Sequence, residues 1–138
     1  MKLVADANVL LSAVLGGRAK AVLQHPAIDE LLTPEVALSE VQEYAVILAR
    51  KRRLSMDTLL LAVAALPVTV VEQAVYSRVL SRARRLIGRR DPDDVDVLAL
   101  ALHTELPLWS NDNDFEAAGV EWYTTAELLR KLGISEGR

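Results

Sequence analysis

Short apolar runs alternate along the chain with longer stretches in which apolar residues recur at helical spacing. The short runs, one of them β-branched, predict buried strands, and the longer stretches predict helices packed through one face. The predicted strands are Lys2–Ala5, Leu31–Thr33, Val68–Val71, Leu108–Ser110 and Val120–Tyr123. Because strands and helices alternate throughout, we expect an α/β fold with a parallel sheet covered by helices.

Residues suited to helix ends mark the predicted helices. Ser55 is a good N-cap, Pro34 suits a first helical turn, and either Thr124 or Thr125 caps the last helix. Gly88 ends an amphipathic helix whose apolar side we expect to carry Val75, Val79, Ala83 and Leu86. The predicted helices are Asn8–Leu15, 19–24, one from Pro34, Ser55–Leu66, Glu72–Ile87, Asp94–Glu105 and a short one near Phe115.

The composition narrows the class of protein. The chain has 138 residues, of which 51% are hydrophobic, and this predicts one domain over residues 1–138 with a sizeable core. The absence of cysteine excludes disulfides, thiolate metal sites and thiol catalysis, and it agrees with a cytoplasmic protein. The longest apolar run, Leu59–Val71, is interrupted by Pro67 and is too short to cross a bilayer. We therefore expect no membrane association.

Acidic residues stand at four places where the predicted fold brings distant segments together. Asp6 follows the first strand, and Asp112 and Asp114 follow the strand in "LPLWS". Asp94 begins the apolar helix "VLALAL", and Glu40 lies in the helix after the second strand. Ligands of open α/β sheets bind beyond the carboxyl ends of the strands, so we expect these acids to converge there.

Converging carboxylates predict a site for a hard divalent cation. Such groups repel one another unless a cation compensates their charge, and Mg²⁺ or Mn²⁺ prefers oxygen ligands. These ions bind phosphate oxygens and activate water. His25 and His103 are isolated in the sequence, and we interpret both as structural.

Basic residues are clustered although the net charge is only -3. Arg78, Arg82, Arg85 and Arg89 share one sector of the predicted Glu72–Ile87 helix and its extension, an arrangement that suits either a phosphate backbone or a solvated surface. Arg89 and Arg90 directly precede the acidic loop "DPDD", so we expect them to bind the phosphates of a nucleic acid beside the acids. A second basic cluster lies in "ARKRRL".

Four acidic blocks, "VADANVLLSAVL", "PEVALSEVQEY", "DPDDVDVLALAL" and "LWSNDNDF", resemble in order those of PIN-domain ribonucleases. The terminal "GVEWYTTAELL" resembles the last strand and helix of that family. The resemblance implies a three-layer α/β/α sandwich with a central, mostly parallel sheet. It also implies RNA cleavage with Mg²⁺ or Mn²⁺. Many small members are VapC-type toxins with an antitoxin partner, so the resemblance extends to a toxin of that type.

The resemblance also implies which residues form the site. The catalytic and metal-binding acids of that family match Asp6, Glu40, Asp94 and Asp112, with Asp114 as a further metal ligand. Asn8 and Ser110 match small polar residues near the metal, while Ala7 stands where a threonine is common. Asp96 remains the alternative to Asp94, and Glu43 the alternative to Glu40. A homodimer is implied as well, and the excess of apolar residues between Val36 and Leu66 predicts its surface.

Other interpretations compete with this one. Asp6 could act only as a helix N-cap, and Asp91 and Asp93 suit a turn around Pro92. A receiver-type phosphoryl-transfer domain needs a lysine late in the fold, but the only lysine after position 51 is Lys131 in the last helix. A catalytically inactive PIN-like module that binds RNA or protein is the remaining alternative, and the acid present in every block argues against it.

Overall fold

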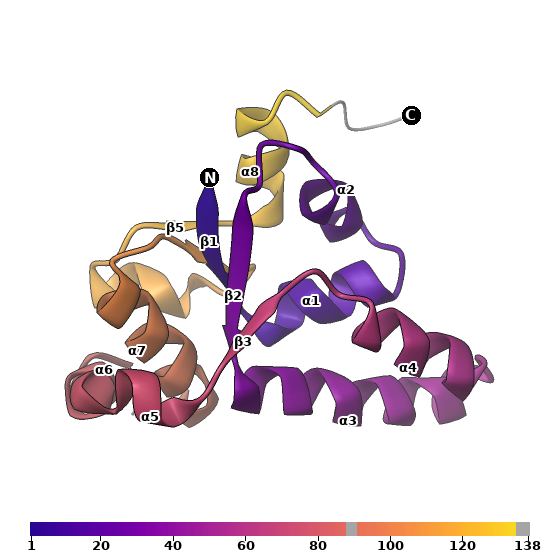
Figure 1. Ribbon diagram of the computed structural model, residues 1–138, viewed down its shortest axis with the longest axis horizontal. Coiled ribbons are helices and arrows are strands. Elements are labelled where there is room, and N and C mark those ends of the chain that lie inside the picture. Colours follow the sequence, from indigo (N-terminus) through magenta and orange to yellow (C-terminus); the bar gives the residue numbers. More distant parts are fainter. Residues whose placement is uncertain (88–90, 135–138) are drawn as a thin grey trace.

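A parallel sheet forms the centre of the protein in a computed structural model that describes residues 1–87 and 91–134 (Figure 1). Within these residues five strands pair in the order β3-β2-β1-β4-β5, and every pair is parallel. The strands are β1 (Lys2–Ala5), β2 (Glu30–Pro34), β3 (Thr69–Val71), β4 (Leu108–Trp109) and β5 (Trp122–Tyr123). The predicted α/β class with a central parallel sheet is therefore confirmed.

Helices cover both faces of this sheet. One group, which includes α7, packs against β1, β2 and β4, and the group of α1 to α4 lies on the other side (Figure 1). The helices are α1 (Ala7–Val14), α2 (Ala19–Leu23), α3 (Glu35–Arg52), α4 (Met56–Ala64), α5 (Gln73–Tyr76), α6 (Leu80–Ile87), α7 (Val95–Thr104) and α8 (Thr125–Lys131). In the described part of the chain, three 3₁₀ helices join them: η1 (Ser77–Val79), η2 (Pro92–Asp94) and η3 (Asn113–Ala118).

The central strand β1 is buried on both faces, as expected of a parallel strand between helical layers. Leu3, Val4 and Ala5 are fully buried, and Val4 lies opposite Leu32 on one side and Leu108 on the other. This register places the carboxyl ends of β1 and β4 side by side. Because the chain order of neighbouring strands reverses at β1, the crevice there is the expected place for a ligand.

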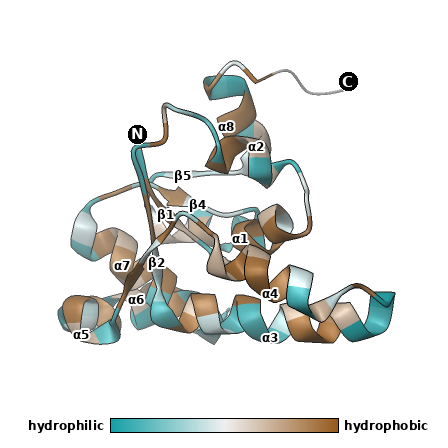
Figure 2. Cartoon of the chain, turned by 45° about the vertical axis from the view of Figure 1, so that its right-hand side comes forward, coloured by the Kyte–Doolittle hydropathy of each residue, from teal (hydrophilic) through white to brown (hydrophobic). Residues whose placement is uncertain are grey.

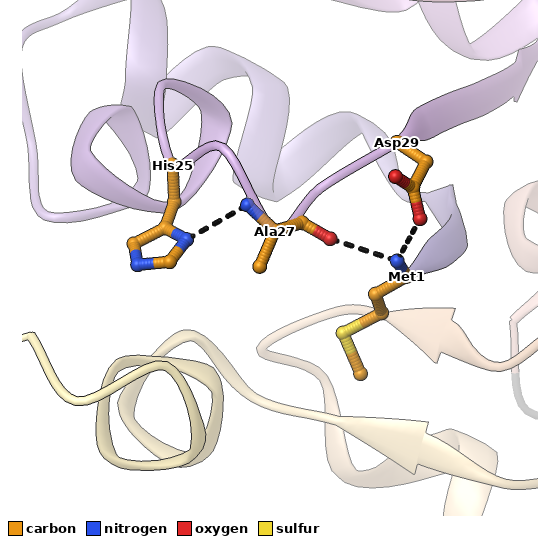
Figure 3. Close-up of polar contacts among 4 residues, drawn as sticks. All are labelled: Met1, His25, Ala27 and Asp29. Carbon is orange, nitrogen blue, oxygen red and sulfur yellow. Dashed lines mark hydrogen bonds and ion pairs between the residues drawn. The ribbon is translucent and has the colours of Figure 1, made fainter.

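Polar contacts anchor the amino end of β1 on the loop before β2 (Figure 3). The Met1 ammonium forms an ion pair with the Asp29 carboxylate and donates a hydrogen bond of 2.7 Å to the carbonyl of Ala27. The same loop is closed by His25, whose Nδ1 accepts from the Ala27 amide at 3.0 Å. His25 therefore has a structural contact, as the sequence predicted.

The core helix α7 is largely apolar (Figure 2), and its middle turn, Val97–Leu100, is apolar on every side. Its residues Val97 to Leu100 are at most 1% exposed, and the helix contacts three strands. A helix that is hydrophobic all round belongs in a protein interior. The position of its first turn, just after Asp94, is therefore set by packing on the sheet.

The predicted continuous helix Glu72–Ile87 is wrong, because η1 separates α5 from α6. The side chain of Tyr76, at the end of α5, is fully buried, and its hydroxyl donates to the Asp96 carboxylate at 2.6 Å. Part of the predicted apolar side of this segment is exposed. Ala83 and Ile87 are buried, whereas Val75 and Leu86, assigned to the apolar side from the sequence, are exposed.

Several predicted helix ends are found where the sequence placed them. Ser55 caps α4 by accepting from the amide of Thr58, and Thr124 forms a capping box with Glu127 at the start of α8. Thr125 is instead the first residue of α8, and its hydroxyl accepts from the Trp109 indole. Gly88 lies outside the described residues. No helix in the described part of the chain is long and apolar enough to span a membrane.

The Tyr76–Asp96 contact predicts a measurable contribution to stability. Replacing Tyr76 with Phe removes a hydrogen bond to a carboxylate, and we expect the free energy of unfolding to fall by about 2 kcal/mol. Urea denaturation of the purified variant measures this loss. Tyr44→Phe is the matched control, because the Tyr44 side chain is exposed and its hydroxyl has no partner in the described structure. Equal stability of the two variants would contradict the assigned role of Tyr76.

Candidate active site

The carboxylate of Asp6 is buried at the point where β1 passes into α1. Its backbone amide extends the sheet by donating to the Trp109 carbonyl at 3.0 Å, and its Oδ1 accepts from the Ala7 amide at 2.7 Å. Asp6 therefore occupies the N-cap position of α1. The cap uses only Oδ1, which leaves Oδ2 for contacts with a side chain of α1 and with one that follows the neighbouring strand β4.

Ser110 and Asn8 hold that second oxygen. The Ser110 hydroxyl donates to Asp6 Oδ2 at 2.8 Å, and the Asn8 amide donates to the same atom at 3.2 Å. Ser110 directly follows β4 and also accepts from the Asp112 amide at 3.0 Å. One fully buried hydroxyl thus links the ends of β1 and β4. The structure places Asn8 and Ser110 beside the acids, as the sequence predicted.

Four aspartates from two segments form a compact group near these residues. One carboxylate oxygen of each lies within 4.8 Å of the corresponding oxygens of the others, and the members are Asp91, Asp94, Asp112 and Asp114. Asp112 accepts from the Asp114 amide at 2.9 Å, which fixes the turn after β4. The buried ring of Phe115 anchors the same turn in the core. Acids from the segment before α7 and from the turn after β4 therefore meet in space.

Asp6 and Glu40 face the same region as this group. They line, with Asp94 and Asp112, a cavity of about 330 Å³ at the carboxyl ends of the strands. Glu40 lies on α3 beside the buried Val41. The four acids predicted to form the catalytic centre are thus brought to one cavity. Asp114 belongs to the compact group of four aspartates but does not line this cavity.

The two alternatives left open by the sequence lie elsewhere. The carboxylate of Asp96 accepts from Tyr76 at 2.6 Å and from Gln73 at 3.0 Å, and it does not line the cavity. Glu43 is exposed on α3 and does not line the cavity either. The structure therefore favours Asp94 and Glu40 as the members of the site.

Sequence reasoning interpreted Asp91 only as a turn residue, and this was incomplete. Asp91 does accept from the Asp93 amide at 3.0 Å, as an N-cap of η2. Its carboxylate also belongs to the group of four aspartates and lines the cavity. The available signal was its position three residues before Asp94, which is about one turn of a helix.

The acids raise one another's pKa values. The pKa of Asp94 is raised to about 9, mainly by burial and in addition by the charges of Asp6 and Asp91. Burial also raises the pKa of Asp6, against the opposing effect of its hydrogen bonds to Ser110 and Ala7. For Glu40, burial raises the pKa first and the charges of Asp93 and Asp6 second. The folded protein therefore disfavours full ionisation of the site.

One oxygen of the site has no protein partner. Asp94 Oδ2 is buried and accepts no hydrogen bond within the described residues. A buried carboxylate oxygen without a partner is costly, and a bound cation would relieve this cost together with the repulsion between the acids. The all-oxygen donor set is the type that Mg²⁺ or Mn²⁺ prefers. The residues present thus fit such an ion.

The arginines considered for phosphate binding lie only partly within the described residues. Arg89 and Arg90 lie outside the described residues. Arg78, Arg82 and Arg85 are exposed.

Taken together, these residues place an acidic cavity at the strand ends of a parallel α/β fold. The family profile of the PIN domain matches residues 4–133, so the chain belongs to the PIN domain family. No match was found among curated proteins.

Solved structures share this fold. VapBC2 from Rickettsia felis, bound to a DNA fragment from its promoter, has a TM-score of 0.71 at 13% identity and covers 90% of this chain and 98% of its own. FitAcB from Neisseria gonorrhoeae has a TM-score of 0.66 at 17% identity, with 91% and 99% covered. Mycobacterium tuberculosis VapC20, a sarcin-ricin loop cleaving toxin, has a TM-score of 0.60 at 20% identity, with 86% and 95% covered.

The raised pKa of Asp94 predicts how the metal-free protein responds to pH. An unfolded aspartate ionises at about pH 4, whereas folded Asp94 keeps its proton to about pH 9. The folded state therefore binds more protons in this window, and the free energy of unfolding falls as the pH rises through it. We expect Asp94→Asn to flatten this dependence in urea denaturation with EDTA present. The control Asp57→Asn, at an exposed position, should leave the pH dependence unchanged. A pH dependence in Asp94→Asn equal to that of the parent would contradict the raised pKa of Asp94.

Proposed function

We propose that the protein is a single-domain ribonuclease that cleaves RNA phosphodiester bonds in the cytoplasm with the help of Mg²⁺ or Mn²⁺. The observation that carries this proposal is the convergence of acids around the buried, unpartnered Oδ2 of Asp94. The PIN domain family match supports a nuclease rather than another metal-site hydrolase.

In this proposal the residues of the site have distinct roles. Asp6, Glu40, Asp94 and Asp112 hold the metal and form the catalytic centre, and Asp114 is a further ligand. The ion, when bound, offsets negative charge at the phosphate and activates water. Ser110 and Asn8 keep the Asp6 carboxylate in one orientation through their contacts with Oδ2. Arg89 and Arg90, as proposed from the sequence, hold RNA phosphates beside the acids.

The likeness to VapC-type structures extends the proposal to a biological role. The structure from Rickettsia felis is that of VapBC2 on its promoter DNA, and VapC20 is described as a toxin. We propose that this protein is the toxin of a toxin–antitoxin pair and binds an antitoxin protein. Purification from the native host, followed by mass spectrometry of the bound protein and RNA, tests for both partners.

Two neighbouring glutamates of α3 allow a matched test of the nuclease. Glu40→Gln removes a charge that faces the cavity, and we expect RNA cleavage to fall by about 10²-fold or more because metal and substrate are misplaced. Glu43→Gln makes the same chemical change one turn away at an exposed position, and its activity should match the parent. Cleavage of a labelled RNA is measured with Mg²⁺, with EDTA, and with EDTA followed by excess Mn²⁺.

The same assay distinguishes the inactive alternative. A catalytically inactive PIN-like module would show no cleavage that EDTA abolishes and Mn²⁺ restores. Equal loss of activity in Glu40→Gln and Glu43→Gln would show that the cavity does not define the site.

We also propose a homodimer formed through α3 and α4. The apolar side chains exposed on these helices and the turn between them include Ile47, Leu54, Leu60 and Leu61, the last of which is 70% exposed. Exposed apolar surface of this extent is typical of an interface. Light scattering at micromolar concentration should give twice the chain mass, and Leu61→Asp should lower it to the monomer value. A monomer mass for the parent would contradict the dimer.

A further inference from the structure

One aromatic side chain stands apart from the others. The sequence contains two Trp, three Tyr and one Phe, and the structure describes all six. Trp109, Tyr76 and Phe115 are fully buried, and the two residues of β5 are partly buried. Tyr44 alone is exposed, with 51% of its surface accessible, and it lines the acidic cavity.

The position of Tyr44 follows from the geometry of α3. Residues four apart in a helix lie one above the other on the same face, so Tyr44 lies about one turn beyond Glu40 on the same face of α3. The ring therefore stands at the rim of the cavity that Glu40 and Asp6 line. Neither a protein hydrogen bond nor core packing in the described structure accounts for an aromatic residue at this place.

We propose that Tyr44 is a stacking platform for an unpaired RNA base next to the phosphate held by the acids. The inference rests on the proposed ribonuclease function and adds the class of substrate. Successive bases stack on aromatic side chains in proteins that bind single strands, and every base offers a suitable face. A base in a duplex already stacks on its neighbours, so an exposed ring favours single-stranded RNA, a loop or a chain end.

The same face of α3 continues toward a cluster of positive charge. Ile47 and Lys51 follow Tyr44 at helical spacing, and Ile47 is 46% exposed. The end of α3 carries Arg50, Lys51, Arg52 and Arg53, all exposed, and it is strongly hydrophilic in Figure 2. None of these four residues forms an ion pair within the described structure.

These cations fit an RNA strand that leaves the cavity along α3. The rise of a helix is 1.5 Å per residue, so Lys51 lies about 16 Å along the axis from Glu40. Unpaired lysine and arginine side chains bind phosphates and release counterions. The Tyr44 ring at the cavity rim therefore matches an RNA base. The unpaired positive charges at the end of α3 match the phosphates of the backbone beyond that base. The proposed dimer surface lies on the same helix, and the experiment separates the two uses of Tyr44.

RNA binding without cleavage tests the proposal. Asp6→Asn serves as the parent, and a single-stranded oligonucleotide carrying 2-aminopurine reports both affinity and stacking through its fluorescence. Adding Tyr44→Ala should weaken binding by about 10-fold and abolish fluorescence quenching, because base stacking is lost. Adding Tyr44→Phe should preserve both. Val36→Ala, which trims another exposed apolar residue of α3 that does not line the cavity, should also preserve both.

The dependence on salt provides an independent signature. Stacking releases no counterions, so Tyr44→Ala should leave the salt slope of the dissociation constant unchanged. Lys51→Ala should reduce that slope by about one phosphate contact. The fully paired duplex of the same sequence should bind the parent and Tyr44→Ala variants equally.

Specific results would overturn the proposal. It fails if Tyr44→Ala binds and quenches like its parent. It also fails if the affinity falls only together with a halved mass in light scattering, because the ring would then belong to an interface between copies. In both cases RNA cleavage by the unaltered protein would leave the proposed function intact. Absence of both cleavage and RNA binding by the unaltered protein would instead overturn the proposed function and this inference together.

Discussion

Like-charged carboxylates resist being packed together, and the end of the parallel sheet holds them together nonetheless. The hydrophobic burial of β1 and α7 sets the positions of Asp6 and Asp94, although the burial and mutual repulsion of their charges are unfavourable in the metal-free state. Core packing can offset this unfavourable free energy, because each buried aliphatic side chain contributes about 1.5–3 kcal/mol. The rest of the site is arranged around this enforced proximity.

The hydrogen bonds around Asp6 show how the position is made specific. Oδ1 is used by the first turn of α1, and Oδ2 is held by Ser110, which follows β4. A single carboxylate therefore joins a local helix cap to a contact across the sheet. The sequence left open whether Asp6 is only a helix N-cap or a member of the acidic site. The two roles are compatible, because a carboxylate has two oxygens and several lone pairs.

Asp94 and Asp96 lie in one short segment but have different surroundings. Both are acids near the start of α7, but the helix turns them toward different surroundings. Asp96 is engaged by Tyr76 and Gln73, and it fastens α5 to α7. Asp94 has a buried oxygen without a protein partner and lines the cavity. The acid in the structural contact and the acid in the cavity thus differ here in their partners rather than in their residue type.

The sequence by itself determined the alternation of strands and helices, the apolar character of α7, and the acids after β1 and β4. These features depend on local periodicity and on where each strand ends, so they are visible in the order of residues. The tertiary structure decided between Asp94 and Asp96 and between Glu40 and Glu43, and it brought Asp91 into the site. It also interrupted the helix before Ile87 at Tyr76 and left Tyr44 as the exposed ring. These outcomes depend on contacts between segments distant in sequence, whose partners and burial no local pattern specifies.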